Sequence, residues 1–174
     1  MVYAASSVYL KCKKTVVLRF FIGSNTVLDV PAKSLDLGMA FIPVILCVDD
    51  DEDDLFFIKE IIKSQGYSFK IEEARNGWEA LNFLQEGLKK NELPCLIIMD
   101  MNMPRMDGKQ AISKIKENEE LSKIPVVVFT TSSNPIHKNY FESQNIRFIT
   151  KPFDYKVFTQ EIIKLLAFCA DLGA

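Results

Sequence analysis

The sequence is poor in the residues that build most metal clusters and disulfide frameworks. Its 174 residues include one histidine and four cysteines, and no two cysteines stand in a C-x-x-C pair. The single histidine, His137, excludes a histidine-rich metal cluster and limits any Ser–His–Asp arrangement to that residue. The scattered cysteines are typical of buried thiols in a reducing compartment, and not of disulfides or a zinc site.

Long hydrophobic runs are also missing. No apolar stretch reaches the roughly 18 residues that a membrane helix needs. The run at residues 15–23 is interrupted by Arg19 and lies behind a basic KCKK segment, which does not suit a signal peptide. We therefore expect a cytoplasmic protein without a membrane partner.

Strong charge of one sign is absent as well, since the formal net charge is −2. Residues 1–38 hold five basic and two acidic residues, whereas residues 39–174 hold 16 basic and 21 acidic ones. Nucleic-acid binding needs a basic face, so we expect no nucleic-acid partner for the acidic part of the chain.

From residue 43 onward, strand-like and helix-like segments alternate. The strand-like segments are short apolar runs, and the helix-like segments carry apolar residues at helical spacing. Strands that are apolar along their whole length are buried on both faces, which predicts a parallel sheet with helices on both sides. The fold class is therefore α/β, a (βα)5 doubly wound five-stranded sheet. We predict strands at 43–48, 69–74, 95–100, 125–130 and 146–150, and helices at 53–66, 76–90, 107–118, 135–143 and 154–169.

Residues 1–42 do not fit this alternation. They contain two strand-like segments, TVVLRFF and NTVLDV, for which no partner element is evident. We predict one domain at residues 43–170 and an N-terminal extension at 1–42 outside its core. Met39 lies just before the first core strand, and we hypothesise that translation starts there.

Polar residues end or follow four of the predicted strands. Asp49 and Asp50 follow the first strand, Asp100 ends the third, Thr130 ends the fourth, and Lys151 follows the fifth. The carboxyl ends of parallel strands share one edge of the sheet. Crowded carboxylates are stable together when a cation lies among them, and oxygen ligands of this kind favour Mg²⁺. A carboxylate beside a metal and a lysine can attack phosphorus and form an aspartyl phosphate.

Each of these features also has a plainer structural interpretation. Acids after a strand cap helices and suit the helix dipole, and the run DDDEDD at 49–54 would do so. A threonine after a strand is usually a cap, and a Lys-Pro pair is usually a turn. The functional interpretation depends on all of these features occurring at the strand ends of one chain.

Four stretches resemble the receiver domain of bacterial response regulators, the CheY-like superfamily. They are VILCVDDDEDD (44–54), LIIMDMNMPRMDG (96–108), PVVVFTTSS (125–133) and FITKPF (148–153). The resemblance covers about residues 43–169. It implies the flavodoxin-like strand order 2-1-3-4-5 and a stand-alone receiver of a two-component phosphorelay. Such a protein is not a conventional enzyme, since it catalyses only its own phosphorylation and dephosphorylation.

The resemblance also implies a role for each residue at the site. Asp100 would accept the phosphoryl group, and Mg²⁺ would be bound by Asp50, Asp100 and the backbone carbonyl of Asn102, with Asp49 acting through water. Lys151 would pair with the phosphoryl oxygens. Thr130 would contact the phosphoryl group and shift on activation, together with the aromatic switch residue Phe148. By the same resemblance, a cis peptide bond is expected between Lys151 and Pro152.

The expected phosphodonor is a sensor histidine kinase or a phosphotransfer protein. Because the sequence ends soon after the fifth helix, we expect no output domain and a downstream partner that is a protein. A homodimer through the fourth helix, fifth strand and fifth helix is a further expectation. The fourth helix departs from the family pattern, being short and beginning at Pro135.

Two other functions remain open at this stage. A pseudo-receiver, a binding module that takes no phosphate, would usually lack the acid pair, the central Asp or the Lys, all of which are present. A phosphatase of the haloacid dehalogenase type would carry its nucleophile on the first strand in a D-x-D pattern. Here the acid pair comes first and Asp100 third, within DMN.

Overall fold

The computed structural model describes residues 17–22, 26–31, 42–66 and 69–173, with side chains from residues 42–66 and 69–166. Residues 42–164 form one compact unit, and the first two strands of the chain belong to a second unit. Within the described residues, no helix is both long and apolar enough to cross a membrane.

The main sheet has five parallel strands in the order β4-β3-β5-β6-β7. Numbered along the domain alone, this is the order 2-1-3-4-5, which confirms the order that the resemblance implied. Each predicted strand is present and is trimmed by one or two residues. The strands are β3 (Val44–Val48), β4 (Lys70–Ala74), β5 (Leu96–Met99), β6 (Val126–Thr130) and β7 (Arg147–Thr150).

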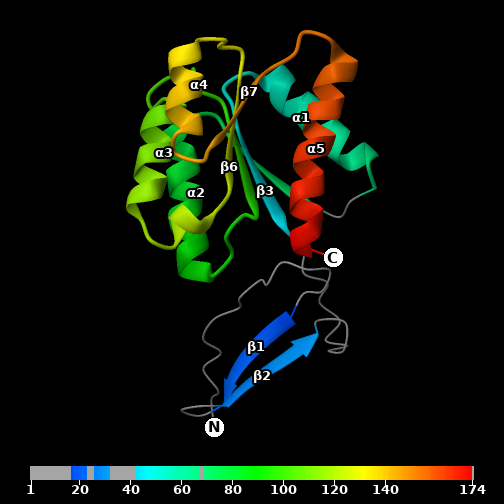
Figure 1. The fold of residues 1–174 in the computed structure, drawn as a ribbon, viewed down its shortest axis with the longest axis vertical. Helices are drawn as coiled ribbons and strands as arrows, with labels where there is room; N and C mark the ends of the chain where they lie inside the picture. The colour runs from blue at the N-terminus through cyan, green and yellow to red at the C-terminus, as the bar shows by residue number, and fades with distance from the viewer. Residues whose placement is uncertain (1–16, 23–25, 32–41, 67–68, 174) are drawn as a thin grey trace. The chain divides into compact units, whose positions relative to one another are not determined.

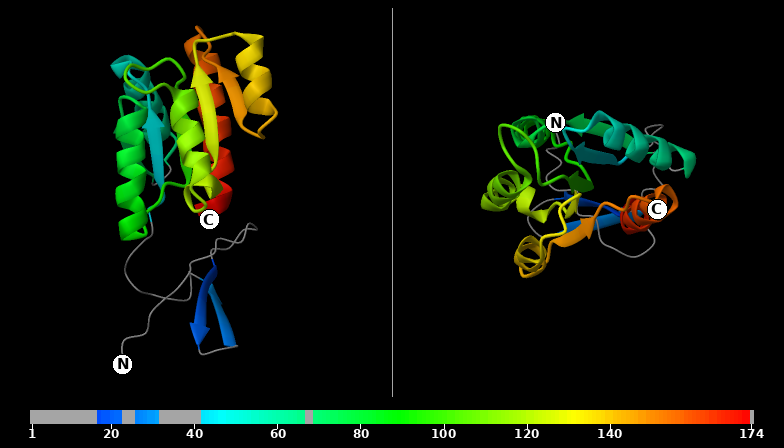
Figure 2. Two further views of the ribbon diagram at one scale, coloured as in Figure 1. Left: turned by 90° about the vertical axis from the view of Figure 1, so that its left-hand side faces the viewer. Right: turned by 90° about the horizontal axis from the view of Figure 1, so that it is seen from above.

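Helices cover both faces of this sheet, as predicted. Figure 1 and Figure 2 show α1 and α5 on one face and α2, α3 and α4 on the other. A single-turn helix, η2 (Leu121–Lys123), was not predicted, because three residues are too few for apolar periodicity to be detected. The other helices are α1 (Glu52–Ser64), α2 (Gly77–Lys90), α3 (Gly108–Glu117), α4 (Pro135–Glu142) and α5 (Tyr155–Gly173).

Side-chain caps determine where four of these helices begin. Asp51, Asn76, Asp107 and Asn134 each accept hydrogen bonds from backbone N–H groups in the first turn of the following helix. Such groups have no partner inside the helix, so a cap stabilises the start of a helix by about 1 kcal/mol. Since each cap lies in a loop after a strand, the caps also hold the loops at the carboxyl edge of the sheet.

The strands in the middle of the sheet are more deeply buried than those at its edges. The central strands β5 and β6 are buried along their whole length, and β3 is buried from Ile45 onward. Each of the edge strands β4 and β7 has one buried residue, Ala74 and Phe148, and its other positions are exposed or half-buried. The central strands are therefore packed on both faces, which places their polar ends against a dry core.

The two strand-like segments near the N-terminus pair with each other. β1 (Val17–Ile22) and β2 (Thr26–Pro31) form an antiparallel two-stranded sheet, in register from Val17 opposite Pro31 to Ile22 opposite Thr26. The sequence did not show a pairing partner for either strand, and the structure shows that β1 and β2 pair with each other. That residues 1–42 lie outside the domain core stays a prediction.

The prediction of a cis bond between Lys151 and Pro152 is wrong. No cis peptide bond occurs in the described part of the chain. An X–Pro bond favours the trans form by about 0.5–1 kcal/mol. In this trans geometry the Lys151 ammonium already reaches the acids of the site, so the cis form is not needed to place it.

Candidate functional site

The strand ends bring the predicted site residues to one edge of the sheet. Val48 lies opposite Met99 in the register of β3 and β5, so the acids that follow these two residues are neighbours. The backbone N–H of Asp100 donates to the carbonyl of Val48 at 2.8 Å. On the other side, the N–H of Lys151 donates to the carbonyl of Thr130 at 2.7 Å.

Three carboxylates gather at this edge. Oxygens of Asp49, Asp50 and Asp100 lie within 4.8 Å of one another. Asp49 and Asp100 are buried, with 4% and 5% of their surfaces exposed, whereas Asp50 is exposed. Burial raises the pKa of Asp49 to about 6, although Lys151 and the backbone of Asp51 act to lower this pKa. The negative charges are therefore held together at a cost in free energy.

Lys151 supplies a buried positive charge beside these acids. Its Nζ lies 2.5 Å from an oxygen of Asp49, 2.6 Å from an oxygen of Asp54 and 3.7 Å from Oδ1 of Asp100. Burial by itself would lower the pKa of Lys151, but the attraction of Asp49, followed by that of Asp54 and Asp100, outweighs burial and raises this pKa. The lysine is therefore charged in the site.

The two oxygens of Asp100 have different surroundings. Oδ2 accepts a hydrogen bond from the backbone N–H of Asn102 at 2.7 Å. Oδ1 is buried and has no hydrogen-bond partner among the described residues. A buried carboxylate oxygen without a hydrogen bond is costly, so a cation bound at Oδ1 would stabilise the site.

The carboxylates of Asp49, Asp50 and Asp100 suit a hard divalent cation that prefers oxygen ligands. The Asp100 Oδ1 atom accepts no hydrogen bond from the described residues, and oxygens of two further carboxylates lie within 4.8 Å. Mg²⁺ is bound by one or two carboxylates and keeps several waters. An exposed acid such as Asp50 leaves room for those waters.

Thr130 and Phe148 lie behind the acids, on the two strands farthest from β3. Thr130 is fully buried, and its Oγ1 accepts a hydrogen bond from the backbone N–H of Ser132 at 3.3 Å. Phe148 is buried and stacks on Phe141 of α4, with ring centroids 6.1 Å apart. The predicted switch residues are thus both packed inside the domain, and β6 lies between β5, which precedes Asp100, and Phe148 on β7.

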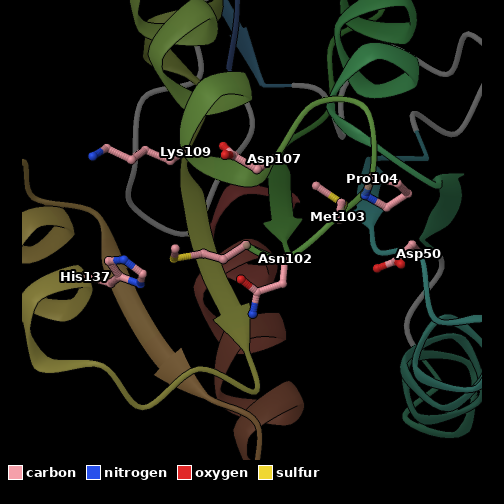
Figure 3. Close-up of a pocket in the computed structure, with 8 residues that line it drawn as sticks. Asp50, Asn102, Met103, Pro104, Asp107, Lys109 and His137 are labelled. Carbon is pink, nitrogen blue, oxygen red and sulfur yellow. The ribbon is translucent and has the colours of Figure 1, made fainter.

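A cleft of about 610 Å³ opens beside the acids. Figure 3 shows Asn102 in this cleft, with Asp50 on one side and His137 of α4 on the other. His137 is half-buried and has no hydrogen-bond partner at Nδ1 among the described residues. The cleft is lined by Asp50, Met101, Asn102, Met103, Pro104, Asp107, Lys109 and His137.

Two residues important to this geometry were not assigned a chemical role from the sequence. Asp54 contacts Lys151, and only the acidic run at 49–54 hinted at it. Gly108 begins α3, and a Cβ added there would lie 2.1 Å from the backbone oxygen of Asp100. The glycine thus lets α3 start directly against the backbone of Asp100.

Comparisons with known proteins identify the family of this chain. The chain matches the response regulator receiver domain over residues 45–163. Response regulator Rcp1 of Synechocystis is 38% identical over 93 residues, which are 52% of this chain and 63% of Rcp1. Protein PilH of Pseudomonas aeruginosa is 29% identical over 71% of this chain and 97% of its own length. Histidine kinase P4 of Formosa agariphila is 41% identical over 70% of this chain, but the match spans only 8% of the kinase.

Solved structures show the same fold. The Mn(2+)-bound form of response regulator Rcp1 has 32% sequence identity and a TM-score of 0.66, over 72% of this chain and 93% of the other. The phosphorylated cyanobacterial phytochrome response regulator RcpA has 27% identity and a TM-score of 0.68, over 73% of this chain and 93% of the other.

Proposed function

We propose that this chain, which belongs to the response regulator receiver domain family, accepts a phosphoryl group on Asp100 in a Mg²⁺-dependent reaction. The family is one of signalling proteins in two-component systems. The observation that carries the proposal is the buried Oδ1 of Asp100, which has no hydrogen-bond partner among the described residues and lies 3.7 Å from the Lys151 ammonium.

The transfer would proceed by direct displacement at phosphorus. Oδ1 of Asp100 attacks the phosphorus, a new O–P bond forms, and the bond from phosphorus to the donor atom breaks with its electron pair leaving on the donor. The N–H of Asn102 holds the other carboxylate oxygen at 2.7 Å and so leaves Oδ1 available as the attacking atom. Lys151 would neutralise charge on the phosphoryl oxygens, and the Thr130 hydroxyl would contact one of them.

Asp50, Asp100 and the carbonyl of Asn102 would hold the Mg²⁺ ion, with Asp49 acting through water. When bound, the ion would neutralise negative charge on the acids and on the incoming phosphoryl group. These roles are supported by the gathering of the three acids within 4.8 Å and by the metal-bound state of the related Rcp1.

The natural donor would be a histidine kinase or a phosphotransfer protein, and the output would be contact with another protein. Receiver-like segments within histidine kinases support the first part, since 41% identity joins this chain to one of them. The net acidic charge of residues 39–174 supports a protein partner over a nucleic acid. A homodimer through α4, β7 and α5 stays a prediction.

The experiment is labelling with a small phosphodonor. Incubated with acetyl phosphate and Mg²⁺, the protein should gain one phosphoryl group that is lost in base or hydroxylamine, as expected of an acyl phosphate. EDTA should stop the labelling, and Asp100→Asn should abolish it because the nucleophilic oxygen is removed while the shape is kept.

Asp107→Asn, which changes an acid in the same cleft, serves as the control and should still be labelled. Labelling of Asp100→Asn at the wild-type rate would show that the acceptor is another residue. A wild-type protein that takes no label would instead indicate a pseudo-receiver.

A further inference from the structure

Lys151 is bound by an acid that lies outside the group of three. Its ammonium donates to Asp54 at 2.6 Å, almost as close as the 2.5 Å contact to Asp49. The side chain of Lys151 is only 6% exposed and that of Asp54 is 22% exposed. A buried ammonium must be paired, and Asp54 supplies one of its two close partners.

The start of α1 explains why Asp54 is available for this contact. In many helices an acidic or amide side chain at this position turns back to the N–H of the capping residue. Here the N–H of the cap, Asp51, donates to Oδ1 of Asp49 at 3.1 Å, while the Asp51 side chain accepts the N–H groups of Asp53 and Asp54. The Asp54 carboxylate therefore does not cap the helix, and it accepts a hydrogen bond from Lys151 instead.

The two acids that accept hydrogen bonds from Lys151 differ in whether they can also bind a cation. Asp49 is one of the three acids whose oxygens lie within 4.8 Å of one another, and Asp54 is not. A cation bound among the three would attract Asp49 and would repel the Lys151 ammonium. Asp54 is then the acid that remains to hold the lysine beside Asp100.

We propose that Asp54 is a positioning residue that keeps Lys151 at the acceptor Asp100 while Asp49 serves the metal ion. This inference rests on the proposed phosphorylation of Asp100. An ammonium has three donors, so Lys151 can keep one hydrogen bond to Asp54 and still donate to a phosphoryl oxygen. Asp54 touches neither the acceptor nor the phosphoryl group and acts only through the lysine.

The test compares Asp54→Asn with Asp53→Asn. Asp53 lies in the same first turn, is exposed and has no ion pair among the described residues, so its substitution controls for the lost charge at the helix start. Asp54→Asn should slow labelling by acetyl phosphate about tenfold at saturating Mg²⁺, the equivalent of one charge-assisted hydrogen bond. Asp53→Asn should leave the rate unchanged, and Asp54→Glu should restore part of it.

Lys151→Ala provides the test of mechanism. In that background, Asp54→Asn should have no further effect on labelling, because the group that Asp54 positions is gone. A second measurement needs neither metal nor phosphodonor. In EDTA, Asp54→Asn should lower the melting temperature by about 3 °C when Lys151 is present and by much less in the Lys151→Ala background.

The outcomes separate this inference from the proposed function. If the wild-type protein takes no label, the proposed function fails, and the melting experiment in EDTA still shows whether Asp54 holds Lys151. If the wild-type protein is labelled but Asp54→Asn slows labelling no more than Asp53→Asn, the positioning role is wrong. An equal effect of Asp54→Asn with and without Lys151 would overturn it as well.

Discussion

The acids at the strand ends differ mainly in which of their oxygen atoms accept hydrogen bonds from the protein. Asp49 uses one oxygen for the Asp51 backbone and the other for Lys151. Asp100 uses one oxygen for the Asn102 backbone, and its other oxygen has no hydrogen bond within the described part of the chain. Two buried acids of the same type, side by side, are thereby given different chemistry by their hydrogen bonds.

The raised pKa of Asp49 predicts how Mg²⁺ binding depends on pH. The folded pKa, about 6, is above the ordinary value of 3.8, so the folded protein takes up a proton on Asp49 as the pH falls through 6. Metal binding favours the ionised acid. The Mg²⁺ affinity should therefore fall about tenfold between pH 7.5 and pH 5, whereas an ordinary aspartate would still be ionised at pH 5.

Calorimetric titration of Mg²⁺ at the two pH values measures this change. Asp49→Asn is the control, since it should bind Mg²⁺ more weakly and lack the step near pH 6. An affinity that is the same at both pH values in the wild-type protein would contradict the assignment.

Gly108 predicts a second effect at the scale of one residue. A Cβ at this position would lie 2.1 Å from the backbone oxygen of Asp100 and 3.0 Å from the Cα of Met101, and backbone atoms cannot move aside cheaply. Gly108→Ala should therefore destabilise the domain by about 2–4 kcal/mol and abolish labelling of Asp100.

Gly66→Ala is the matched control for that substitution. Gly66 has a φ of +72°, but no atom of the described residues other than its chain neighbours lies within 4 Å of its added Cβ. Its replacement should cost only about 1 kcal/mol, from the left-handed backbone conformation, and should leave labelling intact. Urea denaturation of both variants measures the difference, and equal losses would argue against the clash at Gly108.

Among the elements, α4 buries fewer side chains than α1, α2 or α3. It has 8 residues, and Phe141 is its one buried side chain. Phe141 stacks on Phe148 of β7. The anchoring of this helix to the sheet therefore depends on one aromatic residue and its contact with the predicted switch residue.

Phe141→Ala should release α4 while the sheet stays folded. The loss of a buried phenylalanine costs about 3–5 kcal/mol, and the amide hydrogens of α4 should exchange much faster than those of β5 and β6. Hydrogen exchange with mass spectrometry reports both regions. Ile136→Ala, at a position that is 73% exposed, should change neither, and unchanged protection of α4 in Phe141→Ala would contradict this view of the helix.

For the whole molecule, the division of the chain into units leads to a prediction about residues 1–38. Every strand of the five-stranded sheet lies after residue 43, and β1 and β2 pair only with each other in the described residues. A protein that begins at Met39 should therefore fold, bind Mg²⁺ and be labelled like the full chain. Thermal unfolding and acetyl phosphate labelling of both forms test this, and failure of the shorter form to fold would place the extension in the core.

Much of this fold could be predicted from local sequence, because its information is local. A buried parallel strand must be apolar along its length, so β3, β5 and β6 are visible as runs of apolar residues. Polar residues directly after such runs must lie at the carboxyl edge of the sheet, and this places Asp49, Asp50, Asp100 and Lys151 together. The strand order came from family resemblance, since periodicity does not determine which strands are neighbours.

Tertiary structure alone decided the contacts between distant parts of the chain. Asp54 and Lys151 are 97 residues apart, and nothing in the pattern of either segment shows that one reaches the other. Which oxygen of Asp100 accepts a hydrogen bond likewise depends on the backbone N–H groups that the folded loops bring near it. Hydrogen bonds of this kind are set by positions accurate to a fraction of an ångström, and packing of the whole domain determines such positions. The sequence by itself therefore determined the residues available at this edge, and the fold determined which partner each of them has.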